Sequence, residues 1–242
     1  MKVDGFDRGD NVRRVVTTRV DQGAVRLACE GVTVRFGDVE ALSDVTVSVQ
    51  AGEQVVVTGQ AASGKTTWLK CLAGLQRPTA GRVLWGDDDV ATLTIEERRR
   101  RQSAFGMVFQ SDALFDSMTV LENVVLPLTK RAVPRAEAME RADEVLRRVG
   151  LEAARNKRPE ELSGGMKKRA GVARAIVSQP SVLLADDPFA GLDPVTERSI
   201  GELLLEVSRG RTLVAAVPDP VPSLPLARVL RFEAGRLVGG GA

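Results

Sequence analysis

The residues between positions 59 and 67 have the types and the spacing of a phosphate-binding loop. They fit the pattern G-x-x-x-x-G-K-[ST] and follow the apolar run 55–57. Backbone N–H groups at a helix N-terminus form an anion site, Lys65 can reach the outer phosphates of a nucleotide, and the Thr66 hydroxyl is suited to Mg²⁺. We predict that this loop binds a nucleotide through Gly59, Gln60, Ala61, Ala62, Ser63, Gly64, Lys65, Thr66 and Thr67.

A second candidate anion site follows at Ser163, Gly164 and Gly165, which open a helix expected to begin near Met166. A helix N-terminus attracts anions for the same reason as the first loop does. The nucleotide pocket at the phosphate loop has no room for this second set of residues. We therefore expect Ser163, Gly164 and Gly165 to contact a different nucleotide.

With these two motifs the chain resembles the ATP-binding subunits of ABC transporters, over roughly residues 25–238. The resemblance implies a fold of the α/β class, with a P-loop NTPase core, an antiparallel β subdomain and an inserted helical lobe. It also implies ATP and Mg²⁺ as ligands, and a dimer in which the ATP of one subunit meets the second anion site of the other. The partner would be a second ABC subunit, in a homodimer or a heterodimer.

Further residues match motifs of that family in the family's order. Phe36 corresponds to the aromatic residue that stacks on adenine, and Gln110 to the glutamine that contacts Mg²⁺ and senses the membrane partner. Asp186 ends the apolar run 182–186 and corresponds to the second metal-binding carboxylate. The stretch 191–193 corresponds to the loop that crosses to the other subunit. The implied metal ligands are Thr66, Gln110 and Asp186, and the implied catalytic residues are Asp187, Lys65 and Gln110.

Three positions depart from the family pattern. Asp187 stands where the family has the Glu that polarises the attacking water, and Pro218 stands where it has a His that contacts the γ-phosphate. Because loss of a general base costs roughly 10²–10⁴-fold in rate, we expect ATP to be bound well and hydrolysed slowly. Ala62 replaces a glycine of the phosphate loop, which would cost about 1 kcal/mol if that residue needs a positive φ.

The segment 112–120 is expected to dock a membrane permease, because Leu114, Phe115 and Met118 are apolar residues in a connecting segment directly after Gln110. The alternative is that these side chains only cap the helical lobe. Together with Met166 after the paired glycines, this segment resembles the ATPases of Mla-type lipid transporters, which work with MCE-domain proteins. That resemblance implies a lipid as cargo and an MCE-domain protein as a further partner.

Hydrophobic patterning predicts the elements that hold these residues. Residues 1–23 are expected to be a flexible lead-in, 24–238 an ABC ATPase domain with its helical lobe at about 92–180, and 239–242 a flexible tail. The expected strands cover 25–29, 32–36, 45–49, 55–57, 81–85, 107–110, 182–186 and 212–217, and the clearest helices cover 66–75, 135–149 and 195–209.

Composition narrows the function classes. Lys and Arg number 34 and Asp and Glu number 32, a net charge of +2 that does not favour nucleic acid as a partner. The run Arg98–Arg101 follows two glutamates and is interpreted as a solvated helix face. No apolar stretch reaches the ~18–20 residues needed to span a bilayer. We expect a cytoplasmic protein held at the membrane by its permease, with Cys29 and Cys71 reduced in the core.

The sequence therefore predicts the ATP-binding subunit of a membrane transporter, for lipid traffic on the resemblance above. One alternative is a catalytically degenerate, ATP-gated regulatory subunit paired with a competent ABC subunit. Another, a soluble ABC protein acting on DNA or ribosomes, is disfavoured by the near-neutral charge and the absence of a long coiled-coil insertion. The sequence leaves open the cargo, the direction of transport, the type of dimer and the usefulness of Asp187 without a His at position 218.

Overall fold

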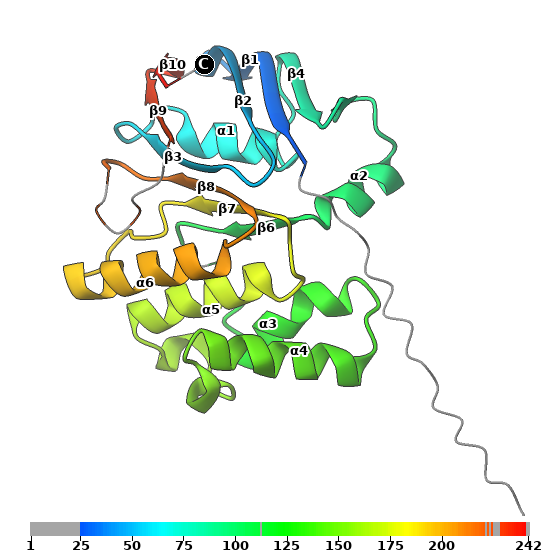
Figure 1. Cartoon of the computed structure of the whole chain (residues 1–242), viewed down its shortest axis with the longest axis vertical. Coiled ribbons are helices and arrows are strands. Elements are labelled where there is room, and N and C mark those ends of the chain that lie inside the picture. The colour runs from blue at the N-terminus through cyan, green and yellow to red at the C-terminus, as the bar shows by residue number, and fades with distance from the viewer. Residues whose placement is uncertain (1–24, 112, 221, 223, 225–227, 241–242) are drawn as a thin grey trace, which may run out of the picture.

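The computed structural model describes residues 25–111, 113–220, 222, 224 and 228–240, and it consists of two β-sheets with helices between and below them (Figure 1). The predicted lead-in at 1–23 and residues 241 and 242 of the predicted tail lie outside the described residues. No helix in the described part of the chain is both long enough and apolar enough to cross a membrane.

The larger sheet has the order β10-β9-β3-β8-β7-β6 and is parallel except for β10. Parallel pairing predicts strands buried on both faces, and β7 and β8 are buried along their whole lengths. The strands are β3 (Gln54–Thr58), β6 (Phe105–Val108), β7 (Val182–Asp186), β8 (Thr212–Ala216), β9 (Arg228–Glu233) and β10 (Arg236–Gly239).

The smaller sheet is antiparallel, with the order β2-β1-β4-β5, as the alternating pattern predicts. Its strands are β1 (Leu27–Phe36), β2 (Val39–Val49), β4 (Ala80–Trp85) and β5 (Asp88–Asp89). The two strands expected at 25–29 and 32–36 are one strand, because the register shifts between Cys29 and Val32 let β1 continue through Gly31.

Helix α1 (Lys65–Leu72) lies between the two sheets (Figure 1). Val55 and Val57 of β3 pack on this side with Trp68, Leu69 and the inner residues of β1 and β2. Val56, between them, belongs to the cluster on the opposite face, as the alternation of side chains along a strand requires. The helix ends at Leu72, three residues before the predicted end at 75, and the chain turns at Gly74 with φ of 67°.

The other face of the large sheet is covered by α5 (Gly164–Ile176) and α6 (Pro194–Val207), and α3 (Val120–Thr129) and α4 (Arg135–Arg148) pack beyond α5 (Figure 1). Short 3₁₀ helices cover Glu152–Ala154 and Pro159–Glu161. The range 92–180, predicted as the helical lobe, also contains the core strand β6 and the helix α2 (Ile95–Gln102). The strand predicted at 107–110 corresponds to β6, which begins two residues earlier at Phe105 and ends at Val108.

Helix α2 carries the arginine run and has no buried residue, which agrees with a solvated face. It begins at a capping box of Thr94 and Glu97 and contacts the antiparallel sheet, where Arg101 pairs with Asp88 at 2.6 Å. Cys29 and Cys71 are both buried and form no disulfide, and burial raises the pKa of the Cys71 thiol to about 12. Both are therefore inert core residues, as predicted.

Candidate nucleotide site

The phosphate loop connects the end of β3 to the start of α1, and its glycines are required by close backbone approach. A Cβ at Gly59 would lie 2.2 Å from the Phe232 carbonyl oxygen, and one at Gly64 would lie 2.7 Å from that of Ala41. Gly64, which has φ of 103°, directly precedes the first helical residue. Because α1 begins at Lys65, the N–H groups of Lys65, Thr66 and Thr67 are left without helical acceptors and can bind phosphate oxygens.

Ala62 has φ of 61°, so the departure from glycine in this loop places a side chain in the left-handed region. The neighbouring Ala61 is not among the residues with positive φ. The left-handed conformation costs an L-residue roughly 1–2 kcal/mol, and this cost falls on the loop that holds the phosphates.

We expect Ala62→Gly to raise the free energy of unfolding by about 0.5–1 kcal/mol, because relief of the positive φ exceeds the extra chain entropy of glycine. Ala61→Gly is the matched control and should lower it slightly. Urea unfolding of both variants beside the parent measures the two differences. Equal destabilisation by both substitutions would contradict strain at Ala62.

The Lys65 ammonium is folded onto the loop itself. Its Nζ donates hydrogen bonds to the carbonyl oxygens of Gly59 at 2.5 Å and Gln60 at 2.8 Å, and to Ser63 Oγ at 3.3 Å. Burial lowers the pKa of Lys65, and the negative charges of Asp187 and Asp186 oppose that shift. The loop thus holds a cation within reach of an anionic ligand.

Two of the three predicted metal ligands, Thr66 and Asp186, are bonded to each other, whereas the amide of the third, Gln110, donates to Asp187 and its contact with a metal stays a prediction. The Thr66 hydroxyl donates to Asp186 Oδ1 at 2.9 Å, across the gap between α1 and the end of β7. Burial raises the pKa of Asp186, and the hydrogen bond from Thr66 opposes this. A hydroxyl and a buried carboxylate are hard oxygen donors of the kind that Mg²⁺ prefers beside nucleotide phosphates, so these residues fit that ion.

Asp187 follows β7 in a left-handed conformation with φ of 44°, and its N–H donates to the Ala216 carbonyl oxygen at 2.9 Å. Its side chain accepts a hydrogen bond from Gln110 Nε2 at Oδ2, with a distance of 3.1 Å. Because the charge of Asp187 also acts on Lys65, the predicted catalytic residues Lys65, Gln110 and Asp187 lie close to one another.

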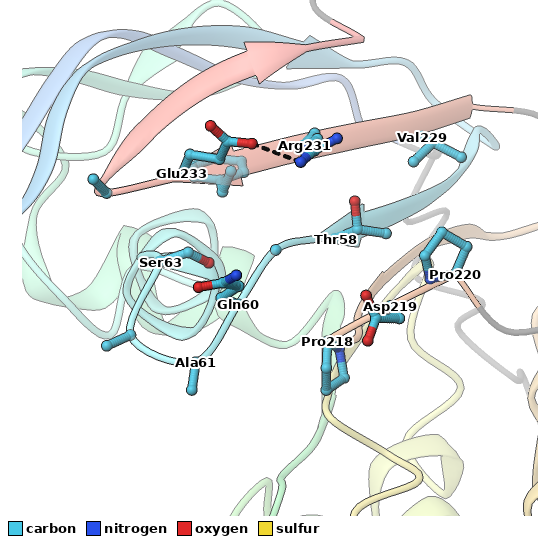
Figure 2. A pocket seen from close by; sticks show the side chains of 14 residues that line it. Thr58, Gln60, Ala61, Ser63, Pro218, Asp219, Pro220, Val229, Arg231 and Glu233 are labelled. Carbon is cyan, nitrogen blue, oxygen red and sulfur yellow. Dashed lines mark ion pairs between the residues drawn. The ribbon is translucent and has the colours of Figure 1, made fainter.

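Pro218 and Asp219 border the loop after β8. The Pro218 carbonyl oxygen accepts a hydrogen bond from Gly59 N at 3.1 Å, and the charge of Asp219 acts on Lys65. Figure 2 shows both residues on the wall of a pocket of about 870 Å³ between the loop and β9, where Arg231 pairs with Glu233 at 2.8 Å. The pocket wall includes Gly59–Ser63 but not Asp186, Asp187 or Gln110, so it adjoins the catalytic groups without containing them.

Ser163 caps the second anion site. Its Oγ accepts the Met166 N–H at 3.3 Å, and α5 begins at Gly164, two residues before the predicted start. A Cβ at Gly165 would lie 2.7 Å from Thr196 Cγ2, so glycine here allows α5 to pack closely on α6. Ser163 and Gly164 are exposed and line no part of the pocket beside the phosphate loop.

Two other predicted residues lie at the rim of the site. Phe36 ends β1 and is 52% exposed, so its ring is available for stacking, which stays a prediction. Asp193 caps α6 by accepting the N–H groups of Val195 at 3.0 Å and Thr196 at 3.1 Å, and the Thr196 hydroxyl lowers its pKa. This gives Asp193 a structural role besides any contact with another subunit.

The apolar residues of the segment expected to dock a permease differ in their exposure. Leu114 packs on the helical core cluster, whereas Phe115 is 48% exposed. Asp112 lies outside the described residues. Leu114 therefore caps the lobe and Met118 is half-buried, whereas docking of a permease at the exposed Phe115 stays a prediction.

Sequence reasoning missed three side chains that hold this segment: Asn123, Lys168 and Arg174. Asn123 is fully buried, and its side chain bonds to the backbone of Phe115 at 2.8 Å and 3.1 Å and of Met118 at 3.2 Å. The signal available in the sequence was a polar residue at an apolar position of a helix.

A phosphate loop after β3, a buried carboxylate at the end of β7, a glutamine that reaches the next carboxylate and a separate helix N-terminal anion site define an ATP-binding cassette. A family model described as "ABC transporter" matches residues 42–190. The chain belongs to this family.

Relatives and solved structures agree with this assignment. The methionine import ATP-binding protein MetN 1 of Bacillus thuringiensis is 43% identical over 171 residues, which are 71% of this chain and 50% of that protein. MetN of Cupriavidus necator is 40% identical over 219 residues, 88% of this chain and 64% of that protein. The chain thus spans about half to two thirds of the length of these relatives.

A dimeric ATP-binding cassette, MJ0796, solved in a post-hydrolysis state with ADP and Pi, is 31% identical with a TM-score of 0.80, covering 88% of this chain and 97% of that one. CbiO1 from Clostridium perfringens, part of the transporter complex cbiONQ, is 29% identical with a TM-score of 0.78, covering 89% of this chain and 87% of that one. The predicted fold class is therefore confirmed. The two MetN relatives are methionine import proteins and give no support to the Mla subtype.

Proposed function

We propose that this chain couples the binding and slow hydrolysis of ATP to conformational change in a membrane permease. The single observation that carries the proposal is a connected path from the phosphate site to an exposed apolar residue. Asp187 is bonded to the side chain of Gln110 at 3.1 Å, and the backbone that leaves Gln110 leads to Phe115. A movement of Asp187 when the γ-phosphate binds or leaves can thus pass through Gln110 to Phe115 at the surface.

The residues divide the work on ATP among them. The loop amides and Lys65 bind the phosphates, and Thr66 and Asp186 would hold Mg²⁺, which would neutralise phosphate charge. Asp187 accepts a proton from the water that attacks the γ-phosphorus, and the bond to the bridging oxygen breaks to release ADP and phosphate. Gln110 orients Asp187 through their hydrogen bond.

Dimerisation completes the site under this proposal. Ser163, Gly164 and Gly165 are exposed or half-buried at the N-terminus of α5 and lie outside the pocket beside the phosphate loop of their own chain. The similar cassette MJ0796 is a dimer bound to ADP and Pi. We infer that a second ABC subunit, identical or different, presents its nucleotide to these residues.

Phe115→Asp should release the subunit from its permease, because it places a charge at the centre of an apolar contact. Loss of such a residue costs on the order of 2 kcal/mol or more, which is roughly 30-fold in affinity. The measurement is co-purification of the permease from detergent. Ile95→Asp is the matched control, since Ile95 is also apolar and 75% exposed but begins α2. Equal retention of the permease by both variants would refute docking at Phe115.

For the cargo, the relatives favour import of methionine or a similar small solute over the lipid traffic that Met166 and the 114–117 segment had indicated. The two proposals differ in what stimulates the assembled complex. Methionine with its binding protein should raise ATPase activity under the first, and phospholipid with an MCE-domain protein under the second. Identification of the co-purified permease partner separates them independently of turnover.

A further inference from the structure

The backbone that follows Gln110 is held by side chains from α5, the helix that carries the second anion site. Lys168 Nζ donates a hydrogen bond to the Gln110 carbonyl oxygen. Arg174 Nη1 donates to the Ala113 carbonyl oxygen at 2.5 Å, where Ala113 has φ of 49°. Gln110 and Ala113 are therefore both hydrogen-bonded, through their carbonyl oxygens, to side chains of α5.

Lys168 is unusual because it is a buried cation. It is 3% exposed, whereas the adjacent Lys167 is half-buried. Burial of an ammonium group is costly unless it is hydrogen-bonded, so this side chain is fixed in place by the acceptors around it. Lys168 lies four residues after Gly164, on the same face of α5 and one turn from the anion site.

Asn123 extends the attachment to Phe115. It is fully buried on α3, bonds to both backbone polar groups of Phe115, and lies on a helix that packs against α5. Gln110 is thus hydrogen-bonded to a buried side chain of α5, and Phe115 to a buried side chain of α3, a helix that packs on α5.

We propose that Lys168 is a positioning residue that transmits phosphate contact at Ser163–Gly165 to the docking segment, defined as residues 113–120. The inference rests on the proposed function and names the side chain through which its coupling runs. Movement of α5 towards a nucleotide carries the Gln110 carbonyl with it through Lys168, and the segment that bears Phe115 follows. Without this bond α5 still binds phosphate, but the segment no longer moves with it.

Hydrogen exchange measured by mass spectrometry tests this on the full chain, with and without Mg²⁺ and a non-hydrolysable ATP analogue. In the parent the analogue should slow exchange in three places: the phosphate loop, the first turn of α5, and 113–120. In Lys168→Met the first two effects should persist, while the protection gained at 113–120 should fall by about tenfold. Lys167→Met is the matched control and should behave as the parent does. Lys168→Arg retains a donor and should restore part of the response.

The outcomes separate the two proposals. Protection absent from the phosphate loop of the parent would refute the proposed function. Protection of all three regions in both Lys168→Met and the parent would overturn the positioning role while leaving ATP binding intact. If Lys168→Met does not fold, Lys168→Arg and Arg174→Lys decide the matter, because each keeps a cation but changes its reach. An unchanged response at 113–120 in both would equally overturn the proposal.

Discussion

Asp187→Asn should lower steady-state phosphate release to background, a loss of about 10²–10³-fold from an already slow enzyme. The substitution removes the carboxylate that Gln110 holds at the site, with Gln110 Nε2 bonded to Asp187 Oδ2 at 3.1 Å. An amide in the same position cannot accept the proton of the attacking water. ATP affinity should be unchanged, because the phosphate contacts come from the loop and Lys65.

Asp187→Glu should act in the opposite direction and raise turnover. Asp is one methylene shorter than the Glu found in the family, and errors of about 1 Å in position cost up to ~10²-fold. The left-handed φ of 44° at Asp187 fixes the direction from which the side chain enters the site, so the longer chain gains reach along it. Pro218→His alone should do little, and together with Asp187→Glu it should exceed the sum of the single effects, because both groups act on one transition state.

Asp219→Asn is the control for charge. Asp219 acts on Lys65 from the loop after β8, so its removal changes the local electrostatics without removing the base. Its effect on turnover should be much smaller than that of Asp187→Asn. A flat series across all these variants, with ATP binding preserved, would defeat the catalytic interpretation of Asp187. That result would favour the alternative of an ATP-gated regulatory subunit.

The sequence predicted the parts of the fold whose residue patterns are local. The phosphate loop has a fixed spacing, and β7 and β8 are apolar runs that a buried parallel strand requires. It placed the bounds of β6 at 107–110 instead of 105–108, and it divided the irregular β1 into two strands between Cys29 and Val32. In both places pairing with neighbouring strands, and not the local pattern, determines the structure.

The distinction between local patterns and contacts between distant residues applies to the site as well. Lys65, Thr66 and Asp186 could be identified from motifs, and the structure brings Thr66 Oγ1 and Asp186 Oδ1 to 2.9 Å. The hydrogen bond between Gln110 and Asp187 joins residues 77 positions apart, and no local pattern encodes it. Lys168 and Asn123 were missed for a further reason. Their importance comes from burial, which the sequence signals only for Asn123, a polar residue at an apolar position of its helix, because nothing in the sequence distinguishes Lys168 from the adjacent Lys167.

Lys65→Ala should abolish measurable ATP binding. The side chain supplies the cation that lies over the phosphate loop, 2.5 Å from the Gly59 carbonyl oxygen and 2.8 Å from that of Gln60. Hydrogen bonds from charged groups contribute about 1.5–3 kcal/mol each, so loss of two phosphate contacts weakens binding by roughly 10²–10⁴-fold. A fluorescent ATP analogue titrated at equilibrium measures this directly.

The fold should survive the substitution, which makes the result specific to binding. Lys65 is half-buried at the start of α1 and belongs to neither core cluster, so alanine leaves no cavity in the core and keeps a residue that favours the helix. Thermal unfolding without nucleotide should therefore show no loss of stability, while the stabilisation that ATP gives to the parent should vanish. Lys70→Ala is the matched control, because Lys70 lies on the same helix but is exposed. Undiminished affinity in Lys65→Ala would overturn the assignment of this loop as the phosphate site.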